Sequence, residues 1–106
     1  MSFDPKKMMA QVAKMQEDLA KAQEDLAGQT VEGSAGGGMV TVTANGQGEI
    51  VAVKLAKEAV DPDDVEMLED LILAAVKEAT RSAQALAQQK MSGLTGGLGG
   101  MGLPGL

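Results

Sequence analysis

The spacing of apolar residues changes twice along this chain, and this change limits the possible folds more than any other feature. In residues 4–27 and 62–91, apolar residues recur every three or four positions, which is the period of an amphipathic helix. Residues 39–55 instead alternate apolar and polar side chains, as strands with one buried face do. The sequence therefore predicts an α+β fold in which two long helices flank a small antiparallel sheet.

The first predicted helix is longer than its own sheet requires. Asp4 is the expected N-cap, Pro5 occupies the first helical position, and Gly28 is expected to end the helix. Its apolar residues are spaced alternately by four and three, like the seam of a coiled coil: Met8, Val12, Met15, Leu19, Ala22 and Leu26. A helix over residues 4–27 spans about 36 Å, so we expect part of this seam to pack against a second subunit.

Three short strands are expected in the middle of the chain, over residues 30–35, 39–44 and 49–55, forming a meander. Residues 45–48, with the sequence NGQG, indicate a hairpin because Asn and Gly tolerate positive φ. The glycines at 33–38 lack the Lys-Ser/Thr ending and the following helix of a nucleotide-binding loop. We therefore expect a tight turn or a close backbone contact there.

The second predicted helix has Asp61 as its N-cap and Pro62 as its first residue, and Gly93 is expected to end it. Its apolar face comprises Val65, Leu68, Ile72, Ala75, Val76, Ala79, Ala83 and Leu86. Residues 58–70 hold seven acidic and no basic residues, which the positive end of the helix dipole favours without any metal or catalytic role. Residues 1–92 are thus expected to form one domain, followed by a flexible Gly-rich tail over 93–106.

The composition excludes most catalytic chemistry. The chain has no Cys and no His, which removes thiolate metal sites, disulfides and the commonest general base. The Ser and Thr residues have no evident base, so we expect neither an enzyme nor a cofactor, metal or small-molecule substrate. With no signal-peptide pattern and no membrane-spanning apolar run, a cytoplasmic protein without membrane contact is expected.

The net charge of −6 is unevenly distributed. Without residues 58–70 the remaining chain sums to +1, and locally basic segments fall on both predicted helices, over residues 1–16 and 77–91. Lys7, Lys14 and Lys21 are seven residues apart and therefore line one stripe of the first helix. Such lysines are ordinarily a solvated face; together with the basic residues of the second helix they could instead contact phosphates.

The order of these segments resembles the YbaB/EbfC family of nucleoid-associated proteins. The resemblance lies in residues 8–19 (MMAQVAKMQEDL), residues 31–42 (VEGSAGGGMVTV), Asp61-Pro62 followed by residues 66–79 (EMLEDLILAAVKEA), and a Gly/Met-rich ending with Leu-Pro-Gly at 103–105. It implies an α-β-β-β-α subunit that dimerises through its sheet, with projecting helices. It also implies binding of double-stranded DNA as a homodimer, association with the nucleoid, and a role in nucleoid organisation and gene expression.

In that family, DNA contact is attributed to residues on the projecting helices. Carried over to the basic positions of the matching helices, the resemblance implies a DNA-binding role for Lys7, Lys14, Lys21, Lys77, Arg81 and Lys90. Nothing in the sequence looks like a recognition helix with Arg, Asn or Gln placed for base edges, so contact with phosphates and DNA shape is expected.

Two other functions remain open from the residues alone. A protein–protein adaptor could dock a partner through the Met-rich first helix, if an apolar groove stays exposed after dimerisation. A peripheral membrane module is less favoured, because the polar face of the first helix carries Glu17, Asp18, Glu24 and Asp25 beside its lysines.

Overall fold

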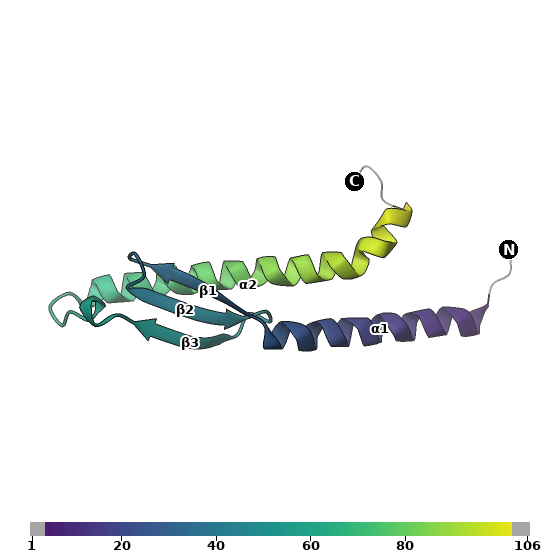
Figure 1. The fold of residues 1–106 in the computed structure, drawn as a ribbon, viewed down its shortest axis with the longest axis horizontal. Helices are drawn as coiled ribbons and strands as arrows, with labels where there is room; N and C mark the ends of the chain where they lie inside the picture. The colour runs from purple at the N-terminus through teal and green to yellow at the C-terminus, as the bar shows by residue number, and fades with distance from the viewer. Residues whose placement is uncertain (1–3, 103–106) are drawn as a thin grey trace.

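The structure, a computed structural model, describes residues 4–102, with side chains as far as residue 94. The elements are α1 (Pro5–Gly28), β1 (Thr30–Ala35), β2 (Val40–Asn45), β3 (Ile50–Leu55), the short 3-10 helix η1 (Lys57–Ala59) and α2 (Val65–Gly102) (Figure 1). The three strands form one antiparallel sheet in the order β1-β2-β3. The predicted α+β fold, with a meander between two long helices, is confirmed.

Helix α1 begins as the sequence predicts. The Asp4 side chain accepts hydrogen bonds from the backbone N–H groups of Lys6 (3.0 Å) and Lys7 (3.4 Å), which confirms it as the N-cap. The helix extends one residue further than expected and includes Gly28. Its C-cap is Gln29, whose N–H donates to the Leu26 carbonyl at 3.2 Å.

The sheet follows the predicted strands to within one residue at each end. Gly33 of β1 pairs with Val42 of β2, which in turn pairs with Val53 of β3. The β1–β2 turn contains three consecutive glycines, residues 36–38, with φ of 65°, 67° and 96°. Residues other than glycine rarely adopt a positive φ. The tight turn expected from the glycine cluster is therefore confirmed.

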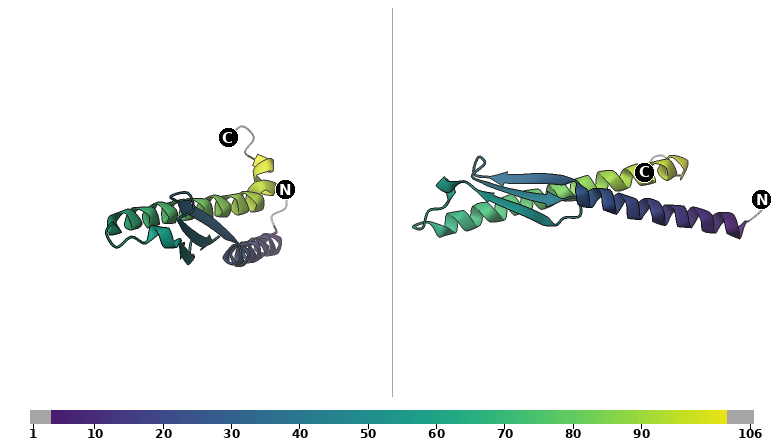
Figure 2. Two further views of the ribbon diagram at one scale, coloured as in Figure 1. Left: turned by 60° about the vertical axis from the view of Figure 1, so that its left-hand side comes forward. Right: turned by 60° about the horizontal axis from the view of Figure 1, so that its bottom comes forward.

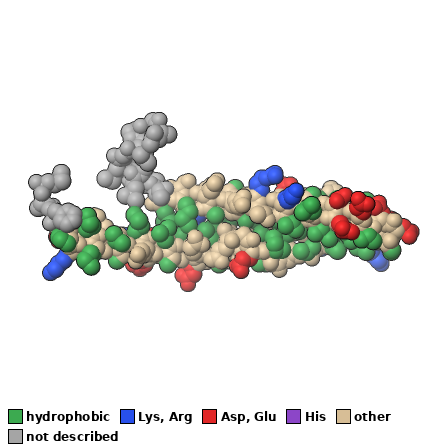
Figure 3. All heavy atoms as spheres, turned by 180° about the vertical axis from the view of Figure 1, so that it is seen from behind, with side chains coloured by type: hydrophobic (Ala, Val, Ile, Leu, Met, Phe, Trp, Pro, Cys, Tyr) green, Lys and Arg blue, Asp and Glu red, His purple; other side chains and the backbone are tan. Residues whose placement is uncertain are grey.

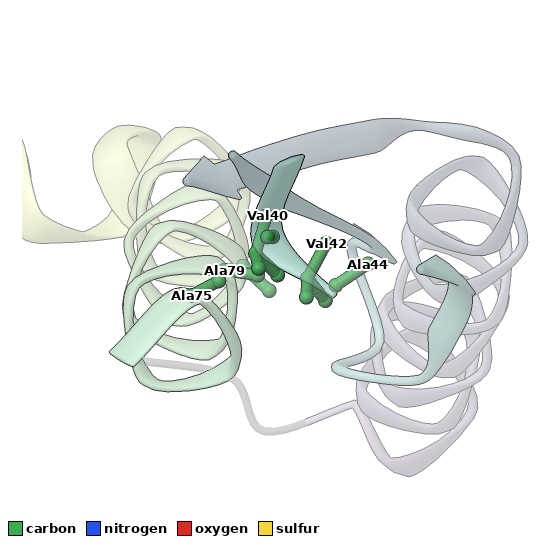
Figure 4. Packing of buried hydrophobic residues seen from close by; sticks show 7 residues of the cluster. Val40, Val42, Ala44, Ala75 and Ala79 are labelled. Carbon is green, nitrogen blue, oxygen red and sulfur yellow. The ribbon is translucent and has the colours of Figure 1, made fainter. Parts of the chain in front are cut away.

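The core lies between α2 and one face of β1 and β2. Val40, Val42 and Ala44 of β2 are fully buried on this face, and they meet a row of small residues on α2 that includes Ala75 and Ala79 (Figure 4). The small side chains let the helix axis approach the sheet closely. Of the three strands, α2 packs mainly on the first two.

The start of α2 differs from the prediction, which placed Asp61 at the N-cap and Pro62 in the first turn. Asp61 instead closes a separate turn: its side chain accepts from the Asp63 N–H and its carbonyl from the Asp64 N–H, both at 3.0 Å. Asp64 then caps the helix by accepting a hydrogen bond from the Met67 N–H at 3.2 Å. The sequence has three aspartates close together, Asp61, Asp63 and Asp64, and any of them could act as the cap. Because Asp61 closes the preceding turn, the helix begins later and Asp64 caps it.

The predicted end of α2 at Gly93 is also wrong, because the helix continues to Gly102. Glycine costs a helix about 1 kcal/mol relative to alanine, yet it keeps the backbone N–H that makes the helical hydrogen bond. The tail expected over 93–106 is therefore helical as far as Gly102, and residues 103–106 lie outside the described residues. Its flexibility and the domain boundary at residue 92 stay predictions.

The subunit is strongly elongated, with extents of 74 × 29 × 16 Å. Helix α1 and the C-terminal part of α2 both extend beyond the same end of the sheet (Figures 1 and 2). We call α1 and the part of α2 that follows Ala83, its last residue in the buried core, the projecting helices. Their length beyond the sheet leaves much of their surface without cover from the rest of the subunit.

Candidate nucleic-acid interface

The lysines of α1 lie on a helix surface that the subunit leaves entirely open. Every residue from Asp4 to Lys21 is exposed, so Lys7, Lys14 and Lys21 all reach solvent. Their spacing of seven residues places them about 10.5 Å apart along the helix. Asp18 lies on the same stripe, four residues after Lys14. The basic charge is therefore concentrated in the N-terminal part of α1.

On α2, Lys77 and Arg81 form a second exposed basic pair. They are four residues apart and so lie side by side on one helix face. Together with Val76, Thr80 and Gln84 they line an open groove of about 310 Å³. An ammonium, a guanidinium and two polar side chains along one groove can donate several hydrogen bonds to an anion such as a phosphate.

Lys90, the sixth predicted contact, is placed differently from the other five. Its Nζ forms an ion pair with Oδ2 of Asp25 at 3.3 Å, and so connects α2 to α1. The side chains of both residues remain partly exposed, at 32% and 48%. The structure therefore divides the six predicted residues into a stripe on α1, a pair on α2, and one residue between the helices.

A cluster of acidic residues lies at the opposite end of the molecule from the start of α1. Figure 3 shows this cluster over the first turns of α2 and the segment before it, while further acidic side chains lie along α1. Because seven acids are concentrated in residues 58–70 and the rest of the chain sums to +1, a chain with a net charge of −6 can still present basic surfaces elsewhere. Among the described residues, no three acidic side chains are placed to share a metal ion. None of the helices in the described part is both long and apolar enough to span a membrane.

An exposed apolar surface on β3 is the main feature that the sequence analysis missed. The alternation in residues 39–55 predicted strands with one buried face, but Ile50, Val53 and Leu55 are 43%, 50% and 38% exposed. The register places Val53 beside Val42 and Leu55 beside Val40, on the face that α2 covers only over β1 and β2. The apolar pattern of residues 50–55 was visible in the sequence, but which strand the helix would cover was not.

The seam of α1 continues this exposed apolar surface. Ala22 and Leu26 are buried, whereas Met8, Val12 and Leu19 are 48%, 52% and 42% exposed. Hydrophobic side chains accordingly form a band along the face shown in Figure 3. This agrees with the expectation that the helix is longer than its own subunit can cover.

The chain is similar in sequence to known proteins over nearly its whole length. The chain is 58% identical over 101 residues to a nucleoid-associated protein from Geobacillus kaustophilus (strain HTA426), covering 95% of this chain and 91% of that protein. It is 48% identical over 103 residues to one from Rhodococcus opacus (strain B4), with 97% and 91% covered.

The fold is shared with a more distant structure. An uncharacterized protein from Helicobacter pylori, of known crystal structure, superposes with a TM-score of 0.72 at 18% identity, covering 92% of this chain and 98% of that one. The model of the YbaB/EbfC DNA-binding family matches residues 1–98, which is nearly the whole chain. The resemblance noted in the sequence is confirmed: the chain belongs to the YbaB/EbfC DNA-binding family.

Proposed function

We propose that this protein binds double-stranded DNA as a homodimer and associates with the nucleoid; the relatives compared above are named nucleoid-associated proteins. The observation that carries the proposal is the exposed stripe of lysines on α1, which extends beyond the end of the sheet away from the acidic cluster at the start of α2. A binding protein, and not an enzyme, is also what membership of a DNA-binding family implies.

The exposed surface of β3 supports the homodimer. A subunit this small seldom leaves a row of large apolar side chains open to water. Burying Ile50, Val53 and Leu55 against a second copy would remove this surface and pair or cover the free edge of the sheet. Dimerisation through β3 would also leave the projecting helices of both subunits free to contact DNA.

The basic residues support contact with the sugar–phosphate backbone. We propose that Lys7, Lys14, Lys21, Lys77, Arg81 and Lys90 form the basic surface that DNA meets. Exposed ammonium and guanidinium groups attract phosphates and release counterions, an interaction that depends steeply on salt. The proposed binding is therefore directed at phosphates and DNA shape.

A titration of the purified protein into fluorescent duplex DNA, at low and at physiological salt, tests this function. We expect binding that weakens steeply as salt rises. A matched pair of variants locates the site: Lys77→Gln with Arg81→Gln should weaken binding, whereas Lys54→Gln with Lys57→Gln removes the same charge from β3 and η1 and should have less effect. No binding at low salt, or equal losses in the two variants, would contradict the proposal.

The adaptor function keeps one observation in its favour, which is the exposed seam of α1. Met8 and Met15 of this seam are each 48% exposed, and methionine suits adaptable apolar contacts. A folded dimer that binds no DNA at low salt would make this the leading function.

A further inference from the structure

We propose that the β2–β3 turn, through Gln47, and the ion pair between Asp25 and Lys90 are positioning elements that set the direction of α1. By doing so they determine how far the lysines of α1 lie from Lys77 and Arg81 on α2. The inference rests on the proposed function for its effect on DNA, but its structural part can be tested without DNA.

The first step is that α1 is held only at its C-terminal end. Residues 4–21 are all exposed, and within the helix only Ala22 and Leu26 are buried. Within one subunit, the direction in which the helix leaves the sheet is therefore set by contacts of its last two turns. Any contact that holds these two turns also affects the position of the rest of α1.

The β2–β3 turn makes such contacts. The N–H of Gly46 donates to the carbonyls of Leu26 (2.8 Å) and Gln29 (2.9 Å), and the Gln47 side chain donates through Nε2 to the Gln23 carbonyl at 2.9 Å. A Cβ atom at position 46 would lie 2.7 Å from the Leu26 carbonyl oxygen, so only glycine allows this approach. The β2–β3 turn is thus hydrogen-bonded to Gln23 and Leu26 in the last two turns of α1 and to Gln29, which follows the helix.

The turn itself is held in one conformation. Asn45 is 5% exposed, and its Oδ1 accepts hydrogen bonds from the N–H groups of Gln47 and Glu49, both at 3.0 Å. Its Nδ2 donates to Oε1 of Glu49 at 2.8 Å. The Gln47 backbone N–H is held by Asn45, and the Gln47 side chain donates to the Gln23 carbonyl of α1.

The second attachment comes from α2. The ion pair between Asp25 and Lys90 joins the helices beside an open cleft of about 500 Å³, which is lined by Gln23 and by Ala87, Gln88, Met91 and Ser92 of α2. Polar contacts at the margin of this cleft, among them the ion pair, therefore contribute to the separation of the two helices. Gln23 takes part in both features, since its carbonyl accepts the bond from Gln47.

The length of α1 amplifies small changes at this attachment. Residue 7 lies about 22 Å along the helix from residue 22, so a tilt of about 10° displaces it by about 4 Å. A charge-assisted hydrogen bond to a phosphate tolerates only a fraction of that displacement. Loss of either attachment should therefore weaken DNA binding without removing a contact to DNA.

The structural test is a distance measurement between the projecting helices. Because the chain has no Cys, spin labels at Ala13→Cys and Ala85→Cys would be its only labelled sites, and dilution with unlabelled protein isolates the distance within one subunit. We expect Gln47→Met, which keeps the length but removes the donor, to shift or broaden the distance distribution. Gln47→Lys, which restores a donor, should recover it. An unchanged distribution in Gln47→Met would overturn the inference.

The DNA test uses the sign of an electrostatic effect. Asp25→Asn removes a negative charge, so electrostatics alone would tighten DNA binding. Positioning predicts the opposite, a loss of about three- to fivefold, on the scale of one exposed ion pair. Asp18→Asn is the matched control, because Asp18 is exposed on the same stripe and forms no ion pair among the described residues, and it should bind slightly more tightly.

The two tests separate the two proposals. If the wild-type protein fails to bind DNA, the proposed function fails, and the distance measurement still decides whether Gln47 positions α1. If the wild type binds DNA but Asp25→Asn binds as tightly as Asp18→Asn, the function stands and the positioning role of the ion pair is refuted.

Discussion

Gly33 of β1 lies directly against the backbone of Ala79 in α2. A Cβ atom at position 33 would overlap the Ala79 amide nitrogen and would also contact the Ala75 carbonyl oxygen. Because Gly33 has no side chain, the backbones of β1 and α2 are in direct contact at this point. Because α2 continues from this contact into its projecting part, Gly33 also anchors one of the two helices proposed to meet DNA.

Replacing Gly33 with alanine should therefore destabilise the protein by about 1–3 kcal/mol or more, as overpacking in a rigid contact does. Urea denaturation monitored by circular dichroism measures the loss. Gly28→Ala is the control, since a Cβ there meets nothing within 4 Å and the residue is helical. Equal stability of the Gly33→Ala and wild-type proteins would show that α2 can move away from β1 freely.

The buried Asn45 should be needed for the stability of the β2–β3 turn. Asn45→Ala removes the oxygen that accepts two backbone N–H groups and should lower the free energy of unfolding by about 1–3 kcal/mol. Glu49→Gln keeps an acceptor for the Asn45 amide and should stay within about 0.5 kcal/mol of wild type. A loss as large in Glu49→Gln would mean that the charge of Glu49, and not the Asn45 oxygen, holds the turn.

Two substitutions of valine by aspartate should separate folding from association. Val42 is fully buried beneath α2, so Val42→Asp places a charge in the core and should unfold the subunit. Val53 is 50% exposed on β3, so Val53→Asp should chiefly abolish the dimer.

Analytical ultracentrifugation and circular dichroism distinguish these outcomes. Lys54→Asp is the control for Val53→Asp, because it adds an acid to the same strand on the opposite face of the sheet. A Val53→Asp protein that is still dimeric at micromolar concentration would place the interface away from β3. A folded monomer from Val53→Asp would show that the dimer is not obligate for folding.

The lysine stripe of α1 should contribute to the salt dependence of DNA binding. Replacing Lys7, Lys14 and Lys21 with glutamine should weaken binding, and each lost phosphate contact should reduce the slope of log K against log salt by about 0.9. The dimer should remain intact, because these residues lie on α1 and not on β3, where the dimer surface is proposed.

Lys6→Gln serves as the control for Lys7→Gln. It removes the same charge one residue away, but from a different face of α1. If the two single variants lose the same affinity, general charge and not the stripe determines binding. If the triple variant keeps both its affinity and its salt slope, the site lies elsewhere, with Lys77 and Arg81 as the remaining pair.

The features that could be predicted from the sequence are those that depend on near neighbours. The N-cap Asp4, the helix period of α1 and the alternation in β2 each involve residues within about four positions, where backbone geometry alone determines what meets what. The start of α2 was misplaced even so, since several aspartates competed as caps and the turn over residues 61–64 decided among them.

The sequence by itself thus determined the type and order of the helices and strands and the absence of Cys and His, and through its resemblance it indicated the family. Only the tertiary structure decided that α2 leaves β3 uncovered, that Lys90 pairs with Asp25, and that Gly46 makes room for Leu26. These relationships join residues far apart in the chain, so they depend on how helices pack on a sheet and not on any local spacing. The proposed dimer surface and the direction of α1 both follow from that packing.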